Sequence, residues 1–364
     1  MSYVQGASSF YMFTMGDKNY TLIGDQHNIK GVCTNVDAIS IDDLLRNWLT
    51  YNNVNGIITD FYIEEKFTRE NVRMQKRQQR DDKGAHNWLE TVIFDMEPCL
   101  IRDKSNCTLL PNVHSHYVDI RYLDEYGLIL DPFNIDLIHR YLEKHSNNDI
   151  NDIKHDILLI FTIYMNHYIA LLNMMIKPLL KNIFMYFKKN YYNTFKVPAI
   201  RNIFFNQLHD IVDKVSVVRN NVVMHKAASQ LLKLSPQDAD KVSKFIYTKA
   251  NTYMGHFKQH YHEQLKNTEF LMQYDPSIKP LLLFVDGMKG YLEYMVSLSM
   301  DAYTLGRILS QPLSSEIIVY AGYAHIEHYK EFFTEYYNAT LTINNPPTWN
   351  DQCLYIDYSF NNYF

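Results

Sequence analysis

The pattern that most constrains this fold is an alternation of strand and helix signals at both ends of the chain. In the first third, apolar runs at 9–14, 20–23, 56–63 and 112–120 have the composition of strands, and helix patterns separate the later runs. Strands that alternate with helices are typical of a largely parallel α/β sheet. The alternation returns at 316–320 and continues from there. We therefore expect one sheet assembled from both ends of the chain.

The region between these ends has a helical pattern. Helix signals run through residues 132–310, and Ser235-Pro236 is a specific start signal, because serine is a good N-cap and proline suits the first helical position. We predict an α/β fold whose mostly parallel sheet comes from a core domain of residues 1–131 and 311–364. A large all-α insertion, residues 132–310, then interrupts this core.

Two local signals refine the first third of the chain. The tetrapeptide at 15–18 lies between two apolar runs and contains Gly16, a pattern that predicts a hairpin. Ser40 is a good N-cap for a helix that has two aspartates in its first turn. The apolar face expected for this helix consists of Ile41, Leu44, Leu45 and Trp48.

Charge excludes one broad class of function. The chain has 35 Lys and Arg against 40 Asp and Glu, a formal net charge of −5, and a pI near 6.3. Dedicated nucleic-acid-binding proteins usually have a basic excess. We therefore do not expect a nucleic-acid partner.

Cysteine spacing and hydropathy indicate the compartment. The four cysteines form no CxxC pair, which indicates reduced thiols and a cytoplasmic protein. The uncharged stretch Ile157–Ile176 has the length of a membrane span, but Asn166 and His167 interrupt it. A buried helix of a bundle is the favoured interpretation, and we do not expect a membrane partner.

Two GxxH tetrapeptides are the strongest candidates for chemistry. Gly24-Asp25-Gln26-His27 and Gly322-Tyr323-Ala324-His325 each follow a predicted strand. Ligands of open α/β sheets bind at the carboxyl ends of the strands. We expect each glycine to allow a sharp turn, so that the histidine projects over this edge as a ligand or a base. The alternative is a turn histidine that only makes local hydrogen bonds.

Other polar residues are expected at the same edge. Two glutamates end the strand at 56–63, polar residues end the strand at 112–120, and more lie on the helix before the strand at 316–320. A structural ion-pair network or ordinary exposure is the alternative for each of them. These candidates are Glu64, Glu65, His116, Asp119, Arg121, Asp301, Tyr303 and Arg307.

These residue types permit two forms of water activation. His27, Glu64 and His325 can hold a divalent cation such as Mn, Co or Zn and leave a position open for water, whose pKa the metal lowers. Without metal, a histidine paired with Glu64 or Glu65 can act as a general base. An arginine, Arg121 or Arg307, can bind an anionic group or stabilise an oxyanion. Asp25, His116, Asp119, Asp301 and Tyr303 are predicted to contact the substrate.

The paired motifs also resemble a known group of proteins. Two GxxH elements around a helical insertion resemble the TraB/Tiki group and its erythromycin esterase-like and ChaN-like relatives. The motifs LIGDQHN, DFYIEE, HSHYVDIR, DAYTLGR and IIVYAGYAHIEHY, in this order, resemble uncharacterised proteins of large cytoplasmic DNA viruses. The resemblance implies an α/β core with a site of His27, His325 and Glu64 or Glu65. Esterase-like relatives carry glutamate after the first glycine, where this chain has Asp25.

The resemblance implies a function and leaves an alternative open. Tiki-type members are described as divalent-metal-dependent proteases, and esterase-like members use histidine and glutamate to activate water. We therefore expect a hydrolase acting on a small molecule or peptide. The alternative is a catalytically inactive capsid or virion protein with viral or self-association partners, which the 29 tyrosines would suit. The expected location is the cytoplasm of an infected cell, with the virion as the alternative.

Overall fold

A computed structural model describes residues 2–26, 33, 35, 37–66, 92, 109–119, 149, 151–157, 159–160, 162–163, 188–206, 233–274, 279–311, 313–347 and 353–357. The chain divides into two compact units. Met1–Ile120 and Tyr303–Phe364 form the first unit, and Arg121–Ala302 form the second.

The first unit contains a six-stranded mixed sheet with strands from both ends of the chain. Its order is β6-β5-β7-β3-β2-β8. The pairs β6–β5, β5–β7 and β7–β3 are parallel, whereas β2 is antiparallel to both β3 and β8. The α/β architecture is therefore confirmed. The bounds are β2 Ser9–Met15, β3 Lys18–Asp25, β5 Thr59–Lys66, β6 Val113–Asp119, β7 Glu316–Gly322 and β8 Leu341–Asn345.

The predicted hairpin explains why the sheet is mixed. Strands β2 and β3 are separated by Gly16 and Asp17 alone, and Gly16 has a φ of 64°, a backbone angle that glycine adopts readily. A connection of two residues is too short for the crossover that parallel strands need. Strands β2 and β3 are therefore antiparallel, and β3 is left to pair in parallel with β7 on its other side.

Helix α1 (Ile41–Val54) covers one face of the sheet. The predicted N-cap is confirmed, because the Ser40 side chain accepts a hydrogen bond from the backbone N–H of Asp43. The predicted apolar face is buried as well, and Trp48 packs in a core with Phe61 of β5 and Tyr320 of β7. The face of the sheet on which α1 packs is called the α1 face below.

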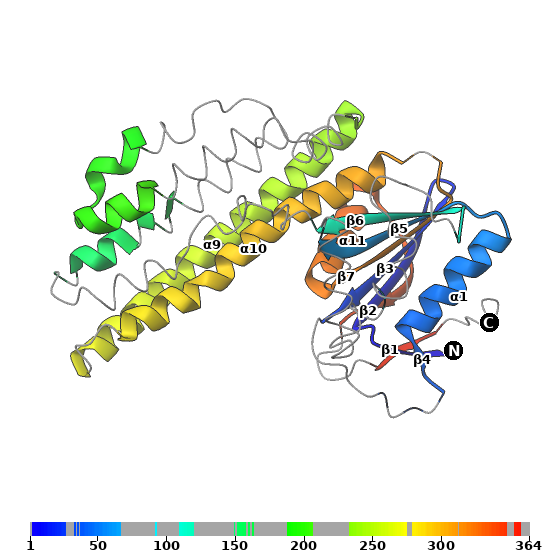
Figure 1. Ribbon diagram of the computed structural model, residues 1–364, viewed down its shortest axis with the longest axis horizontal. Coiled ribbons are helices and arrows are strands. Elements are labelled where there is room, and N and C mark those ends of the chain that lie inside the picture. Colours follow the sequence, from blue (N-terminus) through cyan, green and yellow to red (C-terminus); the bar gives the residue numbers. More distant parts are fainter. Residues whose placement is uncertain are drawn as a thin grey trace. The chain divides into compact units, whose positions relative to one another are not determined.

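Helix α11 (Tyr323–Tyr337) lies against the opposite face, called the α11 face, and touches β2, β3 and β7 (Figure 1). The Phe333 ring lies 5.3 Å from that of Phe13 and 5.2 Å from that of Tyr20. The helix ends at Asn338, whose φ of 52° is left-handed. The buried residues recur with helical spacing: His325, Ile326, His328, Tyr329, Phe332 and Phe333.

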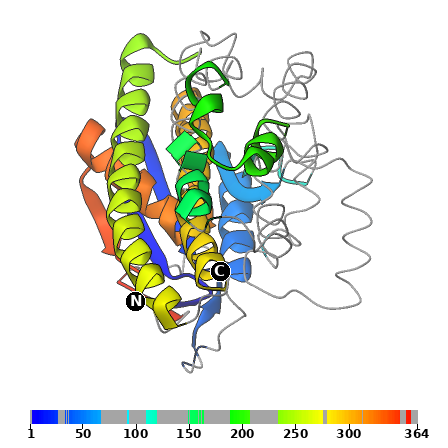
Figure 2. The same cartoon turned by 90° about the vertical axis from the view of Figure 1, so that its left-hand side faces the viewer.

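Two long helices, α9 (Pro236–Tyr274) and α10 (Lys279–Leu309), run antiparallel and side by side (Figures 1 and 2). In the second unit, the Tyr253 and Tyr294 rings stack with centroids 5.6 Å apart, and those of Tyr261 and Phe284 lie 5.3 Å apart. The predicted start signal is confirmed, because Ser235 accepts a hydrogen bond from the backbone N–H of Asp238. The last turns of α10, from Tyr303 onward, belong to the first unit.

A buried carboxylate connects two other segments of the second unit. Asp156 accepts hydrogen bonds of 2.6 Å from the backbone N–H groups of both Lys196 and Val197, just after the short 3₁₀ helix η2 (Tyr192–Thr194).

No described helix is long and apolar enough to cross a membrane. Most of Ile157–Ile176 lies outside the described residues.

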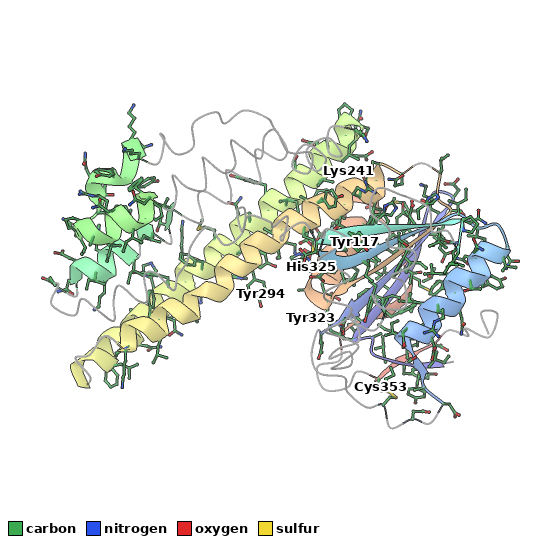
Figure 3. All side chains as sticks on the ribbon, viewed as in Figure 1. Tyr117, Lys241, Tyr294, Tyr323, His325 and Cys353 are labelled. Carbon is green, nitrogen blue, oxygen red and sulfur yellow. A yellow bond between two sulfur atoms is a disulfide. The ribbon has the colours of Figure 1, made fainter. Side chains whose placement is uncertain are left out.

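A small second sheet in the first unit brings two distant cysteines together. Its order is β4-β1-β9, with β1 at Ser2–Gln5, β4 at Ile39–Ser40 and β9 at Cys353–Ile356. Cys33 and Cys353 form a disulfide, with Cα atoms 5.0 Å apart (Figure 3). This differs from the expectation of reduced thiols, because a pair separated by 320 residues leaves no spacing signal in the sequence.

The burial of Glu316 predicts that the stability of the folded protein depends on pH. It is buried at the start of β7, and burial raises its pKa to about 7. The folded state therefore holds this proton more tightly than the unfolded state, whose pKa is near 4.5, and stability falls as pH rises from 4.5 towards 7. We expect Glu316→Gln to raise the free energy of unfolding at pH 8 by about 3 kcal/mol, and to change it little near pH 4.

Urea unfolding of both proteins across this pH range measures the difference. The exposed Glu335 on α11 offers a matched control, and Glu335→Gln is expected to follow the wild-type curve. Parallel curves for Glu316→Gln and wild type would contradict an ionisation cost at Glu316.

Candidate active site

Glu64 and His325 meet at the carboxyl edge of the sheet. Side chains alternate along β5, so Phe61 and Ile63 pack in the core with α1, and Glu64 lies on the α11 face. One Glu64 oxygen accepts the backbone N–H of Gly322 at 2.6 Å, and the other lies 3.6 Å from His325 Nε2. Glu64 and His325 are each only 6% exposed. One carboxylate thus joins the end of β5 to the start of α11.

The passage from β7 directly into α11 sets the position of His325. Gly322 ends β7 and is the N-cap of α11, and His325 lies in the first turn of the helix (Figure 3). That turn has backbone N–H groups without partners inside the helix, and a carboxylate is favourable there. Glu64 therefore has both a hydrogen-bond donor and a favourable dipole at its position.

A second polar cluster lies on the same face, nearer the start of β5. The parallel register pairs Asp60 with His114 and Tyr62 with His116. Asp60 Oδ1 lies 2.9 Å from His116 Nε2 and 3.2 Å from His114 Nδ1. Arg307, from the last turn of α10, has its Nη2 atom 2.5 Å from His116 Nδ1. Arg307, His116 and Asp60 thus form a continuous chain of hydrogen bonds.

Arg307 determines which nitrogen of His116 carries the proton. A guanidinium only donates, so His116 Nδ1 accepts and Nε2–H donates to Asp60. Burial and the positive charge of Arg307 lower the pKa of His116, although Asp60 pulls it upwards. Burial alone would raise the pKa of Asp60, but the interactions around it, the hydrogen bond with His116 first among them, outweigh burial and lower it. The chain at neutral pH is guanidinium, neutral imidazole and carboxylate.

Tyr62 lies between the two clusters. It occupies the α11 face two residues after Asp60 and two before Glu64, and it is completely buried. Its ring stacks on His116, with centroids 4.6 Å apart and planes 24° apart. The site is therefore a polar row along β5, bordered by His116 of β6 and by α11.

The other predicted residues lie elsewhere in the fold or outside the described residues. Asp25 is buried at the end of β3, and alternation places it on the α1 face with Ile23, where its charge adds to burial in raising the pKa of Tyr320. Asp119 is buried at the end of β6, and Asp301 and Tyr303 are buried on α10. His27, Arg121 and the side chain of Glu65 lie outside the described residues.

Two of the predicted metal ligands, Glu64 and His325, lie close enough together to share an ion. Glu64 and His325 approach to 3.6 Å and are of the types that divalent transition metals accept. Within the part of the chain that the structure describes, no group of three or more His, Cys, Asp or Glu side chains is arranged to hold a metal. Since the predicted third ligand is His27, the complete set stays a prediction.

The two motif glycines do not make the sharp turns that the sequence predicts. Gly24 lies inside β3, Gly322 has a φ of −53°, and neither has a left-handed backbone angle. A Cβ atom on Gly24 would instead lie 2.2 Å from Ser9 Oγ and 3.0 Å from Tyr323 Cα. Gly24 therefore allows β3 to approach β2 and the start of α11 closely.

Sequence reasoning missed the chain through Asp60 and the role of Tyr62. The signal was the alternation in 60–64, which places Asp60, Tyr62 and Glu64 on one face of a strand. Asp60 lies four residues before Glu64, about 13 Å down the strand, and is therefore not at the strand edge. The partner Arg307 is 191 residues from His116, and no local pattern shows such a contact.

No protein-family model, curated protein or solved structure matches this chain. The resemblance to the TraB/Tiki group therefore stays a prediction from motifs.

The chain of hydrogen bonds predicts the protonation of His116. We expect ¹⁵N NMR at pH 7 to show a neutral ring with the proton on Nε2, and a pKa below the usual 6.5. Arg307→Met is expected to raise that pKa, because it removes a nearby positive charge. A proton on Nδ1 at pH 7, or a pKa that falls in the variant, would contradict the arrangement.

The close packing around Gly24 predicts that a larger side chain at this position destabilises the fold. Gly24→Ala is expected to lower the free energy of unfolding by about 1–3 kcal/mol, because the new methyl group overlaps Ser9 and presses on the backbone of Tyr323. Gly255→Ala in α9 is the matched control, since nothing lies within 4 Å of its Cβ position. There we expect stabilisation of roughly 0.5–1 kcal/mol, from better helix propensity. Chemical denaturation measures both, and equal effects of the two changes would argue against the close approach.

Proposed function

We propose that this protein is a hydrolase of the Tiki or erythromycin esterase-like kind, in which Glu64 and His325 activate water. The observation that carries the proposal is the buried pair itself, held between the end of β5 and the first turn of α11. A histidine beside a fixed carboxylate is a common general base. The carboxyl edge of an open α/β sheet is also where such sites usually lie.

In the proposed reaction, water attacks the carbonyl carbon of an ester or amide. His325 takes the proton from that water, and Glu64 stabilises the imidazolium that forms. When the carbon–oxygen or carbon–nitrogen bond breaks, His325 returns the proton to the leaving group. The hydrogen bond from the backbone N–H of Gly322 holds Glu64 in place throughout the reaction, so the carboxylate does not have to reorganise.

A divalent cation fits the same site. His27, Glu64 and His325 would hold Mn, Co or Zn, and the ion would lower the pKa of bound water. Asp119, Arg121 and Asp301 stay proposals as substrate contacts, and Glu65 stays one as an alternative to Glu64. We also propose that residues 132–310 form an all-helical insertion in a core of 1–131 and 311–364.

One observation favours the alternative function. Glu64 and His325 are each only 6% exposed, which leaves little surface for a substrate. An inactive virion protein that uses the fold as a scaffold would need only their structural contacts. Activity measurements separate the two functions.

Variants at the pair test the proposed hydrolase. We expect His325→Ala and Glu64→Gln to lower kcat/KM by roughly 10²–10⁴-fold, because each removes one partner of the general base. The assay is a panel of esters and peptides, with Mn, Co, Zn or a chelator. His328→Ala is the matched control, since His328 is 7% exposed on the same helix, one turn further on, and is expected to keep activity.

The wild type could also fail to hydrolyse any member of the panel with every metal. That result would overturn the hydrolase and favour the scaffold. An equal loss in His328→Ala would show that the effect comes from the packing of α11 and not from chemistry.

A further inference from the structure

Arg307 is a cation that lacks an anionic partner in the part of the chain the structure describes. Its Nη2 atom contacts His116, whose accepting nitrogen shows the ring to be neutral. Its Nε atom is buried and has no hydrogen-bond partner. The carboxylate at the other end of this chain of hydrogen bonds, Asp60, bonds to His116. Arg307 is half-buried, and a partly desolvated guanidinium without a counter-charge favours an external anion.

Tyr62 adds a second donor without a partner. Its side chain is completely buried on the α11 face, and its hydroxyl has no hydrogen-bond partner among the residues that the structure describes. Burial, and after it the negative charge of Asp60, raise the pKa of Tyr62, whereas the charge of Arg307 lowers it. The phenol is therefore protonated and can donate. An unsatisfied buried hydroxyl is destabilising, so it too favours a ligand that accepts a hydrogen bond.

Two residues of α10 belong to the same surroundings. Tyr303 and Thr304 precede Arg307 by four and three residues, so they share a side of the helix with it. Both are buried, and the hydroxyl of Thr304 has no hydrogen-bond partner. The region thus gathers a positive charge and hydroxyl groups, and its carboxylate Asp60 is already bonded to His116.

We propose that Arg307 and Tyr62 form an oxyanion-binding site that takes a carboxylate or a phosphate of the substrate. A guanidinium and a hydroxyl can both donate to one oxyanion, and such charge-assisted bonds are strong. Tyr62 precedes Glu64 by two residues on the same face, roughly 7 Å along the strand. An anion held at Tyr62 would therefore place a neighbouring bond of the same molecule near Glu64 and His325. The substrate class rests on the proposed hydrolase, but binding of the anion does not.

Thermal unfolding of the full chain tests the site with phosphate and with acetate. Chloride at equal ionic strength corrects for the effect of salt. A ligand that binds the folded state raises the melting temperature by mass action, which yields an apparent Kd. We expect phosphate, acetate or both to stabilise the wild type more than chloride does. Stabilisation by phosphate alone indicates a phosphate-bearing substrate, and stabilisation by acetate indicates a carboxylate.

Tyr62→Phe is the decisive variant because it removes only a hydroxyl that has no protein partner. The folded state is expected to persist, and the Kd for the anion to weaken roughly tenfold, as for loss of a bond to a charged group. Tyr320→Phe is a matched control: its hydroxyl is equally buried and without a hydrogen-bond partner, but its ring packs on the α1 face. This control is expected to keep the wild-type Kd. Arg307→Gln is expected to abolish binding.

Two results would overturn the site. One is stabilisation by phosphate and acetate no greater than by chloride, and the other is an unchanged Kd in Tyr62→Phe. His325→Ala and Glu64→Gln separate this proposal from the hydrolase, because both are expected to bind the anion normally. Normal anion binding with no hydrolysis in the wild type would leave the site standing and remove the hydrolase. Hydrolysis by a wild type that binds neither anion would support the hydrolase and overturn the anion-binding site.

Discussion

The insertion of β7 between β3 and β5 is the pairing on which the rest of the first unit depends. Strand β7 comes from the C-terminal part of the chain, and both its neighbours come from the N-terminal part. Its parallel register brings Gly322 beside Asp25 and aligns Tyr320 with Ile63. Glu64 can reach the start of α11 only because these strands are paired in this way. The candidate site therefore cannot exist until both ends of the chain have met.

The two faces of β5 show how one strand serves both stability and chemistry. Phe61 and Ile63 bury apolar surface against α1, while Asp60, Tyr62 and Glu64 place polar groups beneath other elements. Buried carboxylates are tolerated only where donors meet them. Asp60 has two histidines, and Glu64 has a backbone N–H and His325. Sequence alternation at one strand thus divides the sheet into a structural and a polar face.

Local elements could be predicted from the sequence, but long-range contacts could not. The Ser40 cap and the hairpin at Gly16 depend on residues close in sequence, and both are confirmed. The predicted strand ends are less accurate, because β3 runs to Asp25 and β5 to Lys66. Glu64 and His325 were found because strand ends of a parallel sheet share an edge. The contact of Arg307 with His116 joins positions 191 residues apart, and no periodicity encodes it. The role of Gly24 also depends on a neighbour, Tyr323, that only the folded chain supplies.

The protonation of His116 connects the two proposed functions of the polar row. A protonated His116 would repel Arg307, so the guanidinium keeps the ring neutral and directs its N–H to Asp60. The charge of Asp60 is then compensated by hydrogen bonds, and the charge of Arg307 is not neutralised by any residue described around it. Arg307 therefore contributes a positive potential beside His116 and Tyr62. Such a potential would draw an anionic group away from the Glu64 carboxylate and orient the molecule that carries it.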